Sequence, residues 1–190
     1  MCGRYYIEID EREIQEIIDK IKKTINDSYE QLTFKMSGEI FPTDNVPVIT
    51  GHDDCQIMKW GFTNFNGNPL INARSETAFE KPTFRKAMLE QRCLIPASGF
   101  YEWKKEGSKK VKYEFSTPGS TMFFAGCWRH QSVDNINRFV ILTRSAVDGV
   151  EDIHDRMPVI IPQRSIERWL GDDPSVMDNP TTKLTKRRVS

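Results

Sequence analysis

Short runs of aromatic and β-branched residues, separated by turn signals, fill the middle of this 190-residue sequence. Such runs are typical of strands, and we predict strands at 55–60, 92–96, 99–103, 110–115, 121–128 and 138–143. Turn signals such as Glu106-Gly107-Ser108 and Pro118-Gly119 separate neighbouring runs. A chain with so many short strands is most easily closed into a barrel-like sheet.

Helical patterns flank these strands. Asp10 and Glu13 resemble a capping box, and isoleucines follow at helical spacing, at positions 14, 17, 18, 21 and 25. This predicts a helix at roughly 10–26 that buries its isoleucine stripe. Pro82 opens a short helix at 83–90, and a last helix starts near Pro162 and ends before Gly171. The expected fold is α+β, with a strand-rich, barrel-like mixed sheet and a few flanking helices. One domain is expected over 1–171, followed by a polar C-terminal tail at 172–190.

The composition limits the possible partners and cofactors. Lys and Arg total 27, as do Asp and Glu, so a nucleic-acid site requires a local concentration of arginines. Four widely spaced cysteines and three histidines argue against a zinc site or a disulfide framework. We therefore expect no metal and no cofactor. The apolar runs are too short to cross a bilayer and the N-terminus lacks a signal-peptide core, which predicts a cytoplasmic protein with no membrane partner.

Cys2 would become the first residue if Met1 were removed. An N-terminal cysteine carries an α-amine and a thiol on adjacent carbons, and both titrate close enough to neutral pH to react. This pair condenses with an aldehyde to an imine and then, by attack of the thiol, to a five-membered thiazolidine. An internal cysteine cannot do this. When the first four residues are considered alone, the simplest interpretation is that Cys2 has no special function.

Three further segments contain residues suited to chemistry: 72–77, 92–103 and 154–158. Each has an ordinary explanation when taken alone. Arg74 could form a surface ion pair with Glu76. Glu102 could be a solvated strand carboxylate, and His154 could be a loop histidine satisfied by a nearby acid.

Together these segments resemble one family, the SOS response-associated peptidases (SRAP), over nearly the whole chain. The resemblance rests on the Met-Cys-Gly-Arg start, Pro42-Thr43, Trp60-Gly61, the Asn-Ala-Arg-Ser-Glu-Thr block at 72–77, the run at 92–103 and His154-x-Arg156-Met157-Pro158. It implies an SRAP-like fold and a DNA-damage response protein that captures abasic sites in single-stranded DNA as a thiazolidine with Cys2. The peptidase label implies self-removal of Met1. Whether the protein also reverses the adduct, as a lyase, stays open.

Four residues are predicted to carry this chemistry: Cys2, Asn72, Glu102 and His154. An abasic deoxyribose is mostly a closed hemiacetal, so ring opening needs an acid/base group, and His154 is suited to it. On a strand, the Glu102 side chain points away from its two aromatic neighbours and can move protons between amine, imine and thiol. Asn72 offers both a donor and an acceptor, for the Cys2 amine or a substrate hydroxyl.

The residues predicted to bind the DNA strand are three arginines, two tryptophans and two residues from the family blocks: Arg4, Arg74, Arg156, Trp60, Trp103, Pro42 and Gly61. The arginines supply the fork geometry that phosphates prefer. The tryptophans offer rings on which bases can stack, which gives binding with little sequence preference.

Two other functions fit parts of the sequence. One is a cysteine-type peptidase acting on other proteins, with Cys2 as nucleophile, His154 as base and Glu102 or Asn72 as the orienting group. A nucleophile at the extreme terminus with no obvious oxyanion loop argues against it. The other is a non-covalent single-stranded DNA-binding module. We expect a monomer that associates with the nucleoid when bound to damaged DNA, and a contact with the replication machinery stays open.

Overall fold

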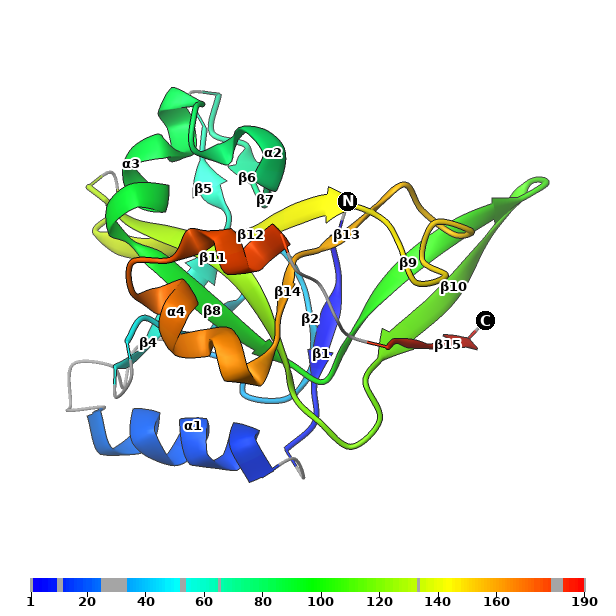
Figure 1. Cartoon of the computed structure of the whole chain (residues 1–190), viewed down its shortest axis with the longest axis horizontal. Helices are drawn as coiled ribbons and strands as arrows, with labels where there is room; N and C mark the ends of the chain where they lie inside the picture. The colour runs from blue at the N-terminus through cyan, green and yellow to red at the C-terminus, as the bar shows by residue number, and fades with distance from the viewer. Residues whose placement is uncertain are drawn as a thin grey trace.

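The computed structural model describes residues 2–9, 12–24, 34–51, 54–64, 66–132, 134–178 and 183–189. The helices and 3₁₀ turns are α1 (Arg12–Thr24), α2 (Ser75–Ala78), α3 (Pro82–Glu90), η2 (Gln163–Ser165), α4 (Ile166–Leu170) and η3 (Pro174–Asp178). The strands are β1 (Tyr5–Ile7), β2 (Gly38–Ile40), β3 (Asn45–Ile49), β4 (Cys55–Trp60), β5 (Phe62–Thr63), β6 (Pro69–Leu70), β7 (Asn72–Arg74), β8 (Arg92–Ala97), β9 (Gly99–Glu106), β10 (Lys109–Ser116), β11 (Met122–Gln131), β12 (Ile136–Ser145), β13 (Arg156–Pro158), β14 (Ile160–Ile161) and β15 (Thr185–Arg188). Figure 1 shows their arrangement.

Five strands close into a barrel. β12 pairs with β4, β4 with β3, β3 with β8, β8 with β11, and β11 returns to β12. The β12–β4 pair is parallel and the other pairs are antiparallel, so the barrel is mixed. The predicted strand-rich, barrel-like fold is confirmed, and the six predicted strands are present as β4 and β8 to β12.

A second sheet of five strands lies beside the barrel, in the order β15-β10-β9-β1-β2. β9 and β10 form a long hairpin that projects from the rest of the molecule (Figure 1). Its turn contains Gly107 at φ +61°, a conformation that favours glycine. The turn pairs Glu106 with Lys109 and thereby fixes the register that places Lys112 opposite Trp103.

Apolar side chains fill the barrel. Large side chains on its strands that are almost completely buried include Met58, Trp60, Phe124 and Phe139. The Trp60 indole donates its Nε1–H to Ile71 O at 3.0 Å and stacks on Phe139, with ring centroids 6.4 Å apart. Burying large apolar side chains contributes about 1.5–3 kcal/mol each, so the barrel core contributes substantially to stability.

Helix α1 covers the barrel at β3 and β4. The described members of its isoleucine stripe are all buried, as the helical spacing predicts: Ile14, Ile17, Ile18 and Ile21. The predicted capping box at Asp10 and the last isoleucine at position 25 lie outside the described residues.

The two other predicted helices are also confirmed. α3 begins at Pro82 and buries Phe84, Ala87 and Met88. The last helix begins as the 3₁₀ turn η2 and continues as α4 up to Leu170. Within α4, Trp169 is buried and donates its Nε1–H to a barrel carbonyl, Cys93 O, at 2.9 Å.

The segment expected to be a polar tail returns to the protein. β15 pairs with β10 and places Arg187 opposite Glu114, whose Oε2 accepts a hydrogen bond from Arg187 Nη2 at 2.8 Å. Val176 in η3 is buried. The sequence did not predict this strand because all four of its residues are exposed and show no alternation of apolar and polar side chains.

Within the described ranges, no helix is long and apolar enough to span a membrane. In the same part of the chain, no cluster of three or more potential metal ligands is found. All four cysteines are buried free thiols.

Candidate active site

Cys2 is held between the barrel and the second sheet. The backbone N–H of Tyr101 donates to Arg4 O at 2.9 Å, which extends the β1–β9 pairing toward Cys2. Asn72 Nδ2 donates to Cys2 O at 2.9 Å and ties the N-terminal segment to β7, which pairs with β12 of the barrel. The Cys2 side chain is fully buried. Two predicted catalytic residues, 70 positions apart in the sequence, are therefore in direct contact.

Glu102 lies on β9 with its side chain buried. It is 4% exposed, whereas Tyr101 and Trp103 on either side are half-buried, as the alternation of a strand predicts. Burial raises the pKa of Glu102 to about 7, and the charge of Asp155 adds to this effect. A carboxyl group with a pKa near neutral pH can both accept and donate a proton.

The Cys2 thiol is electrostatically coupled to Glu102. Burial raises the pKa of the thiol, and the charge of Glu102 raises it further. The thiol is therefore protonated at neutral pH and needs a base before it can act as a nucleophile. Glu102 is close enough for its charge to act on this thiol, which is consistent with its predicted role as the base.

His154 lies in the loop between β12 and β13. Its Nδ1 accepts a hydrogen bond from Arg156 N at 3.0 Å and is 2.9 Å from Asp155 Oδ1. The two contacts require opposite protonation states of Nδ1, and the Asp155 contact is the weaker because that side chain is 84% exposed. Burial lowers the pKa of His154, which favours the neutral ring, and a neutral ring that accepts at Nδ1 carries its proton on Nε2.

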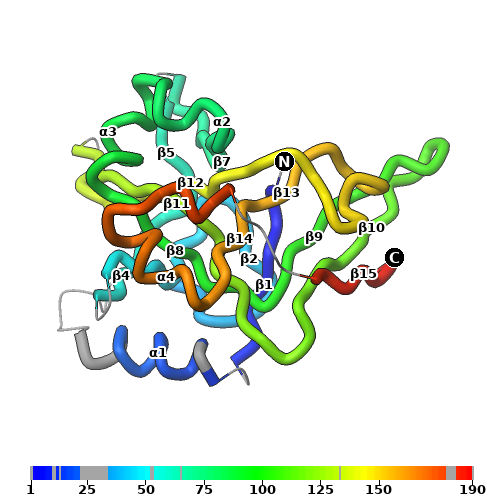
Figure 2. Tube along the Cα trace, in the orientation of Figure 1, coloured from blue at the N-terminus to red at the C-terminus, as the bar shows by residue number. Residues whose placement is uncertain are grey.

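A cavity of about 380 Å³ joins Glu102 to His154. Among the described residues, Trp103, Lys105 and Lys110 also line it. Figure 2 shows the loop after β12 lying beside the hairpin of β9 and β10. Lys186 of β15 contacts the same loop, because its Nζ donates a hydrogen bond to Asp152 Oδ2 at 3.0 Å. The two lysines, which sequence reasoning missed, bring positive charge to the residues predicted to be catalytic.

Cations and aromatic rings share one face of the second sheet. The Arg4 guanidinium carbon lies 3.5 Å from the centroid of the Phe41 ring and 5.7 Å from that of Trp103. Lys112 Nζ lies 3.7 Å from the centroid of Tyr101 and 5.8 Å from that of Trp103. Such contacts stabilise both the cation and the ring orientation.

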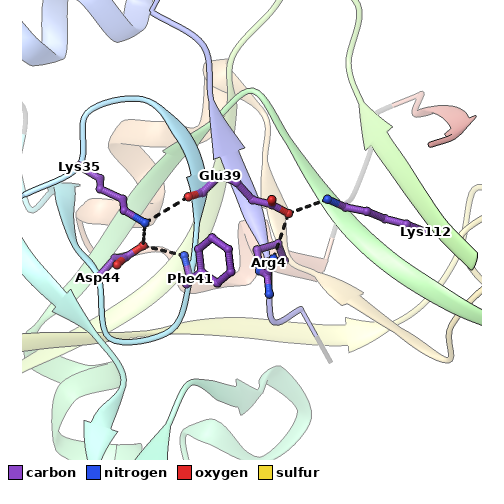
Figure 3. A network of polar contacts seen from close by, with 6 residues as sticks. All are labelled: Arg4, Lys35, Glu39, Phe41, Asp44 and Lys112. Atoms are coloured by element: carbon purple, nitrogen blue, oxygen red, sulfur yellow. Dashed lines mark hydrogen bonds and ion pairs between the residues drawn. The ribbon is translucent and has the colours of Figure 1, made fainter. Parts of the chain in front are cut away.

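Glu39 connects these cations, as Figure 3 shows. Its Oε1 accepts from Arg4 Nη1 at 3.1 Å and from Lys112 Nζ at 2.6 Å. Sequence reasoning found Arg4 and Trp103 but missed Glu39, Phe41 and Lys112. The position of the hairpin turn fixes how β9 and β10 pair, so the sequence could have predicted that Lys112 lies opposite Trp103.

Residues 1–189 match the family described as SOS response associated peptidase (SRAP). The chain belongs to the SRAP family. The abasic site processing protein YoqW of Bacillus subtilis (strain 168) is 32% identical over 185 residues, covering 90% of this chain and 80% of that protein. The abasic site processing protein YedK of Escherichia coli (strain K12) is 34% identical over 119 residues, covering 60% of this chain and 54% of that protein.

Solved structures show that the SRAP fold is shared. A protein from Bacteroides thetaiotaomicron superposes with a TM-score of 0.78 at 21% identity, covering 100% of this chain and 92% of that one. A protein from Bordetella bronchiseptica gives a TM-score of 0.76 at 23% identity and full coverage of both chains. At these identities the similarity shows the fold alone.

Two predicted DNA-binding residues of this SRAP protein are part of the barrel framework. Trp60 is fully buried and its ring packs on Tyr5 and Phe139, so the prediction that it stacks on bases is wrong. Gly61 is buried at φ +111°, and a Cβ there would lie 3.0 Å from Pro69 Cβ. This turn favours glycine at position 61 for a structural reason, and a contact of Gly61 with DNA stays a prediction.

Arg156 is also engaged within the protein. Its Nη1 and Nη2 contact Glu76 at 2.6 and 2.9 Å, and Nη2 also donates to Thr143 O at 2.6 Å. The side-chain hydrogen bond from Arg156 lowers the pKa of Glu76 to about 2. In this structure Glu76 occupies the guanidinium fork of Arg156, and phosphate binding by Arg156 stays a prediction. Glu76 therefore pairs with Arg156, whereas the ordinary explanation of this segment had paired it with Arg74.

The remaining residues predicted to bind DNA lie at the surface around the site. Arg74 ends β7 with an exposed side chain, two residues after Asn72. Pro42 is half-buried and follows Phe41, whose ring contacts Arg4. Trp103 lines the cavity together with Glu102 and His154.

Proposed function

We propose that this SRAP protein processes abasic sites in DNA and captures them as a thiazolidine on Cys2. The proposal rests on one observation above all: the buried Cys2 thiol is coupled to the buried carboxyl of Glu102, while Asn72 holds the Cys2 carbonyl. The names of its relatives, abasic site processing proteins, support the substrate.

Capture requires prior removal of Met1, because the Cys2 nitrogen otherwise belongs to a peptide bond. In this proposal Glu102 takes the thiol proton, and the thiolate attacks the Met1 carbonyl carbon. The peptide C–N bond breaks, its nitrogen receives the proton, and one water then hydrolyses the resulting thioester. Methionine leaves, and Cys2 keeps both its amine and its thiol.

The capture itself needs no oxidant and no cofactor. His154 transfers the proton that opens the closed sugar and exposes its aldehyde. The Cys2 amine adds to the aldehyde carbon and one water leaves, which gives an imine. The thiol sulfur then adds to the imine carbon, its proton passes through Glu102 to the nitrogen, and the thiazolidine ring closes.

Asn72 has a vacant acceptor for this chemistry. While Nδ2 holds Cys2 O, Asn72 Oδ1 is buried and has no hydrogen-bond partner among the described residues. A buried acceptor without a partner is costly. The amine of processed Cys2, or a hydroxyl of the sugar, would supply the missing donor.

The surface around the cavity suits a single DNA strand. Arg74 and Arg4 offer guanidinium groups for phosphates, and Trp103 offers a ring on which a base beside the abasic gap can stack. Such a role places the protein in the cytoplasm, on the nucleoid when damaged DNA is bound. A monomeric state and a contact with the replication machinery stay predictions.

A peptidase that cleaves other proteins is the weaker alternative. The Cys2 thiol is fully buried, and the adjoining cavity is lined by two lysines in addition to Glu102, Trp103 and His154. An extended peptide would have to displace the N-terminal segment to reach the sulfur, whereas a flipped sugar is small.

A single-stranded oligonucleotide with one abasic site tests the proposal. The wild-type protein should give a gel-shifted species that survives denaturation, and Cys2→Ala should give none while still binding DNA. Cys2→Ser keeps the amine but forms a far less stable oxazolidine, so its product should appear only after borohydride trapping. Binding without any denaturation-resistant species in the wild type would favour a non-covalent binding module, and cleavage of added proteins would favour the peptidase.

A further inference from the structure

One face of the second sheet contains charged groups that the proposed chemistry does not use. Neighbouring strands contribute Lys112 from β10, Trp103 from β9 and Glu39 from β2, and Arg4 directly precedes β1. The pairing register aligns them, because Lys112 lies opposite Trp103 and Glu39 lies opposite Tyr6. The result is a row of side chains that crosses the sheet.

Within this row a single carboxylate lies between two cations. Glu39 Oε1 is 3.1 Å from Arg4 Nη1 and 2.6 Å from Lys112 Nζ (Figure 3). All three side chains are partly open to solvent, at 24% for Arg4, 32% for Glu39 and 20% for Lys112. An anion from solution can therefore approach both cations.

We propose that Arg4 and Lys112 form a two-cation subsite for a backbone phosphate of the DNA strand, and that the Glu39 carboxylate occupies this subsite until DNA binds. A carboxylate and a phosphate offer the same kind of anionic oxygen to Arg and Lys. The inference rests on the proposed function, because it names how the same site holds its strand.

The charges around Glu39 indicate that it competes with a phosphate for Arg4 and Lys112, and that it is more than a structural ion-pair partner. The neighbouring carboxylate, Asp44, is already taken by Lys35 Nζ at 2.6 Å and by Phe41 N at 2.8 Å. Among the described residues, Glu39 is therefore the carboxylate that pairs with both Arg4 and Lys112, which leaves one positive charge in excess. Both ion pairs are only partly buried, so a competing anion from solution can exchange with the Glu39 carboxylate.

Glu39 is charged under the conditions in which DNA would bind. Partial burial alone would raise the pKa of Glu39, but hydrogen bonds from Lys112 and Arg4 lower it below its ordinary value. A phosphate approaching the two cations therefore meets a carboxylate, which repels it.

The subsite adjoins the catalytic cavity through Trp103. Both cations lie within 5.8 Å of its ring centroid, and Trp103 also lines the cavity with Glu102 and His154. A phosphate held here would belong to a nucleotide next to the one in the cavity. Glu39 would then weaken the binding of any strand, damaged or not.

Fluorescence anisotropy with an undamaged single-stranded oligonucleotide tests this separately from the covalent chemistry. Glu39→Gln should bind about 3–10-fold more tightly than the wild type, because it removes the competing charge but keeps the shape. Its salt dependence should steepen by about 0.7, the value for one additional phosphate contact on a single strand. Lys112→Ala should weaken binding, and adding Glu39→Gln to it should give a smaller gain than in the wild type.

Glu106→Gln is the matched control, because it removes one negative charge from the same sheet at a residue that contacts Tyr113 and Arg188 instead. Its affinity should stay within about twofold of the wild type. Weaker or unchanged binding by folded Glu39→Gln would overturn the inference, since Glu39 would then orient Arg4 or serve only the fold. If the wild type binds no DNA at all, the proposed function fails, and the inference fails with it.

Discussion

The barrel and the second sheet use the same residue types in opposite ways. In the barrel region, Trp60 donates to a backbone carbonyl and is fully buried, and Arg156 is bound to Glu76 and Thr143 O. In the second sheet, Trp103 and Arg4 are partly exposed and lie against each other. A tryptophan or an arginine in a segment that resembles the family can therefore stabilise the barrel or lie at the candidate site.

The difference arises from how each sheet is closed. The barrel strands pair around a ring and fill it with side chains, so even a polar group there must find a partner inside the protein. The second sheet is open, and its β9–β10 hairpin projects beyond the barrel (Figure 1). Charged groups on it can stay available to a ligand.

The largest expected effect is on the buried carboxyl of the second sheet. Glu102→Gln keeps the shape of Glu102 but cannot transfer protons, so crosslinking to an abasic oligonucleotide should slow by about 10²–10⁴-fold. Removal of Met1 should slow as well. Single-turnover crosslinking and intact mass, measured on the same preparation, check both. A loss below about tenfold would assign Glu102 a positioning role only.

The two tryptophans offer the clearest contrast between the regions. Trp60→Ala should lower the free energy of unfolding by about 3–5 kcal/mol, because it empties the barrel core. Trp103→Ala should cost about 1 kcal/mol or less in stability but weaken single-strand binding by about 1–3 kcal/mol. Urea unfolding and anisotropy measure the two quantities, with Trp103→Phe as a control that retains an aromatic ring. If Trp60→Ala folded normally and lost DNA affinity, the comparison would be wrong.

The buried carboxyl also predicts how stability depends on pH. The pKa of Glu102 is raised on folding, from its ordinary value of 4.5 to about 7, so the folded state holds this proton more tightly than the unfolded state. Stability contributed by this group is present below about pH 4.5 and is lost as the pH rises to about 7, by up to about 3 kcal/mol. Glu102→Gln should lack this loss, so the stability difference between variant and wild type should grow over that range. A constant difference would show that Glu102 ionises normally.

The smallest contrast concerns two arginines near the site. Arg156→Ala should lower stability by about 1–3 kcal/mol, since it removes the hydrogen bonds to Glu76 and Thr143. Arg74→Ala should change stability by at most about 0.5 kcal/mol but reduce the salt slope of DNA binding by about 0.7. Thermal unfolding and salt titrations separate the two. Equal salt slopes in Arg74→Ala and the wild type would remove Arg74 from the DNA surface.

Much of the fold could be predicted from the sequence because its elements follow local patterns. The strand runs, the isoleucine stripe of α1 and the proline that starts α3 are each visible within a few residues. The strand β15 could not be predicted, because its four residues are exposed and its pairing depends on the distant β10.

The site was predictable in its parts but not in its contacts. The alternation around Glu102 indicated that its side chain points away from Tyr101 and Trp103, and the structure agrees. Local sequence could not show that Asn72 would hold the Cys2 carbonyl, nor that Glu76 would occupy Arg156. Both contacts join residues at least 70 positions apart, and only the closed barrel brings them together.

The mass of the DNA adduct tests the central claim most directly. After incubation with an abasic oligonucleotide, the adduct should weigh the sum of the oligonucleotide and the chain without Met1, less one water. Cys2→Ala should give no such species without borohydride. An adduct that retains Met1, or one formed equally well by Cys2→Ala, would contradict capture by an N-terminal aminothiol.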